Sequence, residues 1–280
     1  MTSAPEPQAG DPRGADPRGA DPRGADPRGG GLEASALVSR LPGVSALDLE
    51  VVATEPVTPA MRRLRLRGDG LAALVVEPGQ DFMVAVPADG QQHFRRRYTV
   101  RRLDRSTGTV DLDIVLHGDG PGARWAAAVQ PGDRVEAIGP RGKITVVDEA
   151  DWHLFAGDES AVPATFAMVE ALPASATAVV VLEVAGPEEE QPVSSAADLS
   201  LQWLHRDGTD PGHGTGLVDA VRAVDLPPGR GHCYLAGELR TVAAMRQALV
   251  YRGLDAEQLS TKAYWRLGVA NAAHGEPTRD

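Results

Sequence analysis

Apolar residues alternate with polar or small residues in short stretches between residues 46 and 147. A strand buried on one face has this period of two, because successive side chains point to opposite sides. Turn-forming clusters such as Pro78-Gly79 and Pro131-Gly132-Asp133 separate the stretches. The pattern predicts an antiparallel sheet or barrel over residues 44–150. The clearest stretches are Leu47–Val51, Leu64–Leu66, Phe82–Val86 and Val110–Leu116.

Beyond residue 150 the apolar positions form short continuous runs, which are typical of strands buried on both faces. Stretches with helical spacing separate them, one over Val162–Leu172 and a later one over Leu239–Val250. Alternating strands and helices predict a parallel α/β domain over residues 151–280, with ligands at the carboxyl ends of its strands. The expected strands are Trp152–Ala156, Ala178–Val184, Leu201–Leu204 and Cys233–Ala236.

The first part of the chain has neither pattern. Residues 11–30 repeat Asp-Pro-Arg-Gly with an Ala spacer, and the repeat contains no large apolar residue. Such a segment cannot bury enough surface to offset the entropy lost on ordering, so we expect a disordered tail over residues 1–31. A short connector with some helical spacing follows over residues 32–45, and we place residues 1–43 outside both domains.

Composition narrows the functional classes. The net charge of −11 argues against nucleic acid as a partner, because binding phosphates requires a basic surface. The single cysteine, Cys233, excludes an intrachain disulfide and a cysteine-based metal cluster. No run approaches the ~20 apolar residues that span a bilayer, and the N-terminus has no secretory signal pattern. We therefore expect a soluble, cytoplasmic protein without stable membrane association.

The most informative stretch is Arg96–Arg101, where Tyr98 lies between arginines inside a segment that favours a strand. An aromatic face can stack on a flat ring, a guanidinium binds phosphate, and the Thr99 hydroxyl can bond to the edge of a heteroaromatic ring. The stretch therefore indicates a site for a ring and a phosphate. The alternative is an exposed edge strand guarded by arginines.

A glycine-rich turn, His117–Trp125, follows the expected strand Val110–Leu116 directly. A turn that leads into a helix offers backbone N–H groups at the positive end of the helix dipole, which suits a pyrophosphate. An ordinary connection from strand to helix is the alternative.

The segment Ala156–Ala164 lies where the first strand of the α/β domain turns into its first helix. It lacks the G-x-G-x-x-G fingerprint, which disfavours a Rossmann dehydrogenase. Its acidic pair, Asp158 and Glu159, would repel a pyrophosphate. A place near a nicotinamide or flavin ring, or a helix-capping role, suits the pair better.

Two further motifs lie near the ends of later strands. Arg206, with His205, follows a strand and is a candidate for holding a ribose 2′-phosphate, unless it is a solvated loop arginine. Near the C-terminus, Tyr264 and Trp265 lie between Lys262 and Arg266. This pairing of aromatics and cations is unusual in a chain with only 4% aromatic residues.

These five motifs, in this order, resemble the siderophore-interacting protein family of flavin-dependent ferric-siderophore reductases over about residues 44 to 270. The resemblance implies a ferredoxin-reductase-like arrangement, in which an N-terminal antiparallel FAD-binding β-barrel precedes a parallel α/β domain that binds NAD(P)H. The residues that it assigns to the cofactors are Arg96, Tyr98, Thr99 and Arg101 for the flavin, His117, Gly120, Gly122, Ala123 and Trp125 for the pyrophosphate, and Gly157, Asp158 and Glu159 on the nicotinamide side. Trp265, in the terminal motif, is a further cofactor-binding candidate.

The chain departs from the family pattern in three places. The pyrophosphate loop is one residue short between Gly118 and Pro121. Ala123 stands where a hydroxyl residue is frequent, and Ala263 stands where a glycine is usual. Backbone N–H groups would have to bind the pyrophosphate alone, so we expect FAD to be held less tightly.

The resemblance implies an FAD-containing reductase that passes electrons from NADPH to a ferric siderophore and releases Fe(II) in the cytoplasm. Thr99, Lys262 and Arg266 are the expected catalytic residues, the two cations by attracting anionic siderophores. The protein itself needs no metal ligands for this reaction. A general flavin or ferredoxin-type reductase and a non-catalytic siderophore-binding module remain as alternatives, and reduced ferredoxin remains open as the electron donor.

Overall fold

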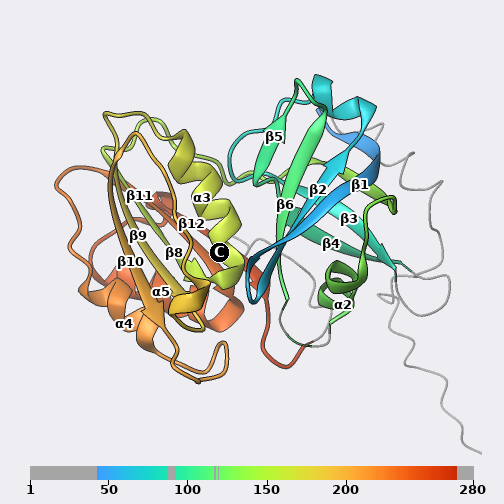
Figure 1. The fold of residues 1–280 in the computed structure, drawn as a ribbon. Helices are drawn as coiled ribbons and strands as arrows, with labels where there is room; N and C mark the ends of the chain where they lie inside the picture. The colour runs from blue at the N-terminus through green and yellow to red at the C-terminus, as the bar shows by residue number, and fades with distance from the viewer. Residues whose placement is uncertain (1–42, 88–92, 117, 119, 270–280) are drawn as a thin grey trace, which may run out of the picture.

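Two β-sheets of different kinds make up the protein, as the computed structural model in Figure 1 shows for residues 43–87, 93–116, 118 and 120–269. The first sheet has seven antiparallel strands and the second has five parallel strands. The predicted fold class, an antiparallel barrel followed by a parallel α/β domain, is confirmed. The expected tail and most of the expected connector lie outside the described residues.

The antiparallel sheet curls into an incomplete barrel. Its strands follow the order β4-β3-β7-β1-β2-β6-β5, which leaves β4 and β5 as edges. One helix, α2 (Pro121–Ala128), packs Ala126 into the barrel core. The strands are β1 (Ser45–Thr58), β2 (Met61–Arg67), β3 (Asp81–Pro87), β4 (His93–Thr99), β5 (Arg102–Asp104), β6 (Thr109–Val115) and β7 (Arg134–Arg141), and a short 3-10 helix, η1 (Asp69–Ala73), follows β2.

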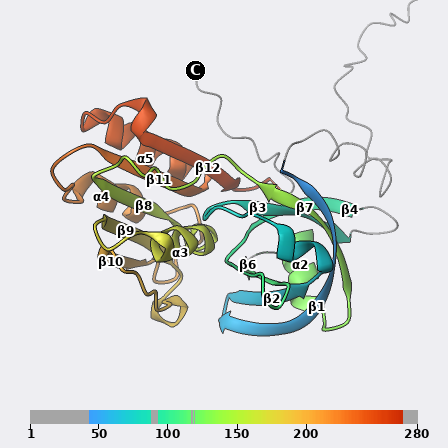
Figure 2. The same ribbon diagram turned by 90° about the horizontal axis from the view of Figure 1, so that it is seen from above.

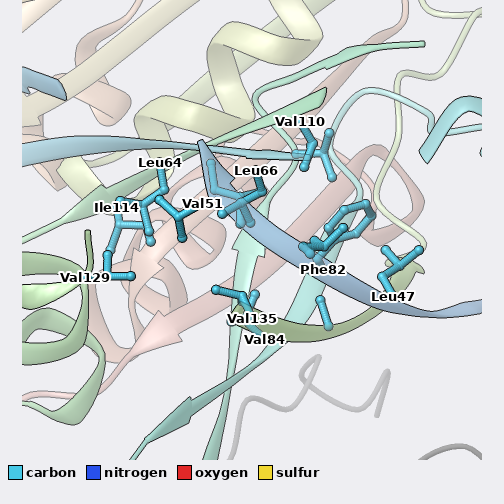
Figure 3. Close-up of a cluster of buried hydrophobic side chains, with 14 of the residues drawn as sticks. Leu47, Val51, Leu64, Leu66, Phe82, Val84, Val110, Ile114, Val129 and Val135 are labelled. Carbon is cyan, nitrogen blue, oxygen red and sulfur yellow. The ribbon is translucent and has the colours of Figure 1, made fainter. Parts of the chain in front are cut away.

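Side-chain alternation explains why these segments form strands. Leu64 and Leu66 of β2 are fully buried in the barrel core drawn in Figure 3. Between them, Arg65 points outward and makes two hydrogen bonds to Asp111 on β6, of 2.7 and 2.9 Å. Opposite charges thus face each other across the β2–β6 ladder, while the leucines bury the other face.

The parallel sheet has the strand order β10-β9-β8-β11-β12. Helix α3 packs on the face that is turned toward the barrel, and α4 and α5 pack on the other face. The elements are β8 (Trp152–Asp158), η2 (Glu159–Ala161), α3 (Val162–Ala171), β9 (Thr177–Val184), η3 (Pro187–Glu189), β10 (Asp198–His205), α4 (Gly216–Ala223), β11 (Gly231–Glu238), α5 (Leu239–Tyr251), η4 (Ala256–Gln258) and β12 (Leu259–Trp265). No described helix is long and apolar enough to cross a membrane.

Polar contacts join the two domains, which lie side by side in Figure 2. Glu189 of η3 accepts a hydrogen bond from the Thr58 hydroxyl and another, of 2.9 Å, from the Ala60 N–H. Lys262 of β12 donates to Asp81 of β3 at 2.7 Å. These buried contacts fix the barrel against the carboxyl ends of the parallel strands, where α/β domains bind their ligands.

Candidate active site

A cleft with a cavity of about 230 Å³ lies between the barrel and the α/β domain. Strand β4, the start of α2, η2 and the chain after β12 all contribute to its walls. The cleft therefore brings together segments from four of the five sequence motifs. The predicted site residues that line it are Arg96, Tyr98, Thr99, Gly120, Gly122, Ala123, Trp265 and Arg266.

Tyr98 lies on the edge strand β4 and its ring stacks on Trp125 of α2, with 6.0 Å between the ring centroids. Burial raises the pKa of Tyr98, so its hydroxyl is neutral at physiological pH. Burial also lowers the pKa of the neighbouring Arg96. Trp125 is absent from the cleft lining, so it supports Tyr98 from the side facing away from the cleft.

The N-terminus of α2 opens into the same cleft. Within the described residues no side chain caps this helix end, and its first turn contains no acidic residue. A Cβ atom on Gly122 would lie only 2.6 Å from the Tyr98 hydroxyl oxygen and 3.6 Å from Cγ of Arg96. Glycine therefore lets the helix start approach Tyr98 closely. The backbone N–H groups at the positive helix end, next to an arginine and an aromatic ring, fit the pyrophosphate and ring of FAD.

Arg62 of β2 secures the other end of α2. Its guanidinium donates to the carbonyl oxygens of Ala126 at 3.0 Å, Ala127 at 2.5 Å and Val129 at 3.3 Å. A cation at a helix C-terminus satisfies the last carbonyls and complements the dipole. Sequence reasoning missed this residue, because Arg62 belongs to an arginine-rich strand and no local motif connects it to α2.

Asp158 ends β8 and is buried. One of its oxygens accepts from the N–H and hydroxyl of Ser160, and Oδ2 accepts from the Glu238 N–H at 2.8 Å and from Trp265 Nε1 at 2.9 Å. Burial raises the pKa of Asp158, and the charge of Glu159 adds to the rise. The carboxylate caps η2, as one of the two sequence-based interpretations expected, and reaches the cleft only through Ser160 and Trp265.

Arg206 lies inside a group of carboxylates. It makes a bidentate pair with Glu159, with distances of 2.6 and 3.0 Å, and Glu183 lies 3.7 Å from the same Nη1 atom. Its Nε has no hydrogen-bond partner in the described part of the chain. Burial raises the pKa of Glu183, although Arg206 opposes the rise. A phosphate would therefore have to displace Glu159 to reach this guanidinium.

Three further predicted residues do not line the cleft and have roles in holding the fold together. Arg101 pairs with Glu170 of α3 at 2.7 and 2.5 Å and so bridges the two domains. The sequence had suggested that Lys262 presents its charge to the cleft. In the structure this side chain is instead buried against Asp81. A Cβ atom on Gly157 would lie 2.3 Å from the Ala236 carbonyl oxygen, so this glycine allows β8 and β11 to approach.

Arg266 differs from Lys262, because it is exposed at the cleft. Thr99 is buried at the end of β4 and also lines the cleft. His117, expected at the pyrophosphate, lies outside the described residues. Among the described residues, no group of three or more His, Cys, Asp or Glu side chains could hold a metal ion.

Comparison with known proteins gives two family matches. Residues 75–144 match the siderophore-interacting FAD-binding domain, and residues 150–268 match the siderophore-interacting protein family. The two matches cover the barrel strands and helix of the cleft and most of the α/β domain.

Individual relatives agree with these matches. The chain is 35% identical over 187 residues to the ferric vibriobactin reductase of Vibrio cholerae, covering 65% of this chain and 68% of that protein. It is 26% identical over 158 residues to the NADPH-dependent ferric-chelate reductase of Escherichia coli, covering 55% and 59%. The crystal structure of a siderophore utilization protein from T. fusca superposes with a TM-score of 0.75 at 34% identity, covering 83% of this chain and 97% of that one.

Proposed function

The chain belongs to the siderophore-interacting protein family, which has an FAD-binding domain, and on this basis we propose that it is a reductase that passes electrons from NADPH to ferric siderophores. Its products would be Fe(II) and the free chelator. Siderophores bind Fe(III) through hard oxygen donors, so reduction weakens the complex and frees the iron.

The observation that supports this proposal most is the cleft itself. The barrel lines one wall of the cleft with Tyr98 and the start of α2, which suit a flavin. The turn after β12 lines another wall with the cation Arg266. When bound, FAD supplies the chemistry that side chains lack, accepting a hydride and giving up single electrons. The chain's own residues would position the ring and pyrophosphate and attract the acceptor.

On the flavin side, Tyr98 provides an aromatic face and Thr99 a hydroxyl at the end of the same strand. Arg96 and the backbone N–H groups at the N-terminus of α2 would hold the pyrophosphate. Because Ala123 supplies no hydroxyl, the backbone N–H groups of α2 carry this role together with Arg96. The contact between Arg62 and the far end of α2 keeps those N–H groups aimed at the cleft.

On the acceptor side, Arg266 is the cation that we assign to anionic ferric siderophores. It is exposed at the cleft in a protein with a net charge of −11, so it provides local attraction against an overall repulsive field. Lys262, which the sequence paired with it, would act on stability through Asp81 instead.

NADPH is the proposed electron donor, and the Escherichia coli relative supports it by name. Arg206 follows β10 at the carboxyl edge of the sheet and would read the 2′-phosphate after displacing Glu159. Glu159→Gln removes the competing charge, so we expect the NADPH/NADH ratio of kcat/KM to rise, by roughly tenfold for one charge-assisted contact. An unchanged ratio in both Glu159→Gln and Arg206→Lys would remove Arg206 from this role.

An absorbance spectrum of the purified protein tests the proposal directly. We expect a flavin spectrum that bleaches on anaerobic addition of NADPH and returns on addition of a ferric siderophore. A flavin that only reduced ferredoxin bleaches would identify a protein donor. A protein without flavin would contradict the reductase and favour a siderophore-binding module.

A further inference from the structure

The chain makes a short turn after β12, and two buried carboxylates hold this turn on either side of Arg266. Asp158 Oδ2 accepts from Trp265 Nε1 at 2.9 Å, and Glu238 Oε1 accepts from the Leu267 N–H at 3.2 Å. Arg266 lies between these two anchored residues. Its own guanidinium is exposed and makes no hydrogen bond or ion pair within the described part of the chain.

Both carboxylates are fixed to the sheet. Asp158 and Glu238 are the last residues of the neighbouring strands β8 and β11, with exposed fractions of 5% and 2%. Asp158 also accepts from Ser160 and from the Glu238 N–H, while Glu238 Oε2 accepts from the first N–H groups of α5. Neither side chain is free to reorient, because every other bond that it makes holds the fold together.

The backbone around the turn is shaped to admit these contacts. Gly237 has a φ of +135°, and a Cβ atom there would lie 2.4 Å from Asp158 Oδ2. Gly212, with a φ of +76°, lies against the far rim of the Trp265 indole, where a Cβ atom would come within 3.0 Å of the ring. The indole is therefore held between a carboxylate and a glycine.

We propose that Asp158 and Glu238 are positioning residues, which hold the Trp265–Leu267 turn so that Arg266 presents its charge to an anionic ferric chelate in the cleft. This inference rests on the proposed function, because it names what sets the acceptor-binding arginine in place. An arginine on an unanchored turn near the end of a chain would lose more conformational freedom when it binds a ligand, and its affinity would fall accordingly.

The test is a double-mutant cycle. Trp265→Phe keeps an aromatic ring but removes the Nε1 donor to Asp158, and Arg266→Ala removes the positioned charge. The matched control is Trp152→Phe, which removes an indole hydrogen bond of 3.3 Å to the Gly229 carbonyl at the opposite end of β8. The probe is the trianionic ferric tris-catecholate complex, titrated at equilibrium against oxidised protein, with the concentration expressed per bound flavin.

We expect Trp265→Phe to weaken binding of the probe by about three- to tenfold, as for loss of one hydrogen bond to a charged group, and Trp152→Phe to leave it unchanged. In the Arg266→Ala background, Trp265→Phe should cause no further weakening, because coupled residues are not additive. Hydrogen exchange at the Leu267 N–H should become faster in Trp265→Phe and stay the same in Trp152→Phe.

The outcomes separate this inference from the proposed function. A parent protein that neither binds nor reduces the ferric probe would contradict the proposed function. Equal weakening by Trp265→Phe with and without Arg266 would show that the indole touches the ligand itself, and would overturn the positioning role. Unchanged exchange at Leu267 in Trp265→Phe would overturn the anchoring of the turn, whatever the ligand.

Discussion

At the scale of single residues, two cations that look equivalent in the sequence have different surroundings in the structure. Lys262 and Arg266 lie four positions apart and flank the same two aromatics. Lys262 is buried and shares Asp81 with Arg97, whereas Arg266 is exposed at the cleft. Burial and the contact with Asp81 therefore give Lys262 a structural role, whereas Arg266 remains available for the role in acceptor binding that we propose.

This difference makes a prediction about the two alanine variants. Lys262→Ala should lower the free energy of unfolding by about 2–3 kcal/mol, because it removes a hydrogen bond to a buried carboxylate that Arg97 still compensates. Arg266→Ala should leave stability within about 0.5 kcal/mol and raise KM for anionic ferric siderophores, more strongly at low salt. Denaturant unfolding and steady-state kinetics measure the two effects. A raised KM in a fully stable Lys262→Ala protein would contradict the assignment.

Two histidines on adjacent strands, His153 and His232, predict a loss of stability in acid. Burial lowers the pKa of His232 to about 4, with the charge of His153 contributing, and burial also lowers the pKa of His153. Between the unfolded value of 6.5 and about 4, the unfolded chain binds a proton that the folded protein does not. The free energy of unfolding should therefore decrease as the pH is lowered across this window.

The effect of His232 should be about 3 kcal/mol at pH 4 relative to pH 7. His232→Gln, which can keep a polar contact to Ser260, should flatten this part of the pH–stability curve. Denaturant titrations at several pH values measure the slope. A curve for His232→Gln that runs parallel to that of the parent would contradict the assignment.

At the scale of elements, α2 joins the core to the site. Its C-terminal half packs into the barrel and is bonded by Arg62, while its N-terminus opens into the cleft. Position 122 decides how closely the helix start approaches Tyr98. Helix stability alone would favour alanine at this position, by about 1 kcal/mol over glycine. The close approach to Tyr98, which the proposed cofactor site uses, requires glycine instead.

Gly122→Ala should reduce the FAD content of the purified protein while changing its flavin-free stability little. The added methyl group meets the Tyr98 hydroxyl and pushes the helix start or the ring out of place. Gly214→Ala is a matched control, because a Cβ atom there meets nothing within 4 Å. Flavin absorbance per protein gives the content. Full FAD retention in Gly122→Ala would argue against this end of α2 as the pyrophosphate site.

The elements also show what the sequence could and could not predict. Strands such as β2 and β6 follow alternation that is visible locally, and β8 and β9 follow continuous apolar runs. Helix α4 was missed, because it has only eight residues and begins at Gly216. The motifs located Tyr98, Gly122 and Arg266 in the cleft. They could not reveal the partners of Lys262 or Arg101, because these lie 181 and 69 positions away in the chain.

At the scale of the whole molecule, the two domains serve as two walls of one cleft. The barrel provides Tyr98 and the start of α2, and the α/β domain provides Ser160 and the turn after β12. Three contacts hold the two walls in their relative positions. Glu189 and Lys262 make buried ones, and Arg101 and Glu170 form a half-exposed pair. The proposed electron transfer requires this arrangement, because the proposed flavin site comes from the barrel and the proposed donor and acceptor sites come from the α/β domain.

Single-turnover iron release is the sharpest test of whether this protein reduces ferric siderophores through its flavin. The protein is reduced anaerobically with NADPH, freed of excess donor and mixed with a ferric siderophore and a strong Fe(II) chelator. We expect about two Fe(II) per flavin, since each reduced flavin gives up two electrons singly. Arg266→Ala should slow this release at low salt. A reduced flavin that reoxidises only with oxygen, without release of Fe(II), would contradict the proposed reductase activity.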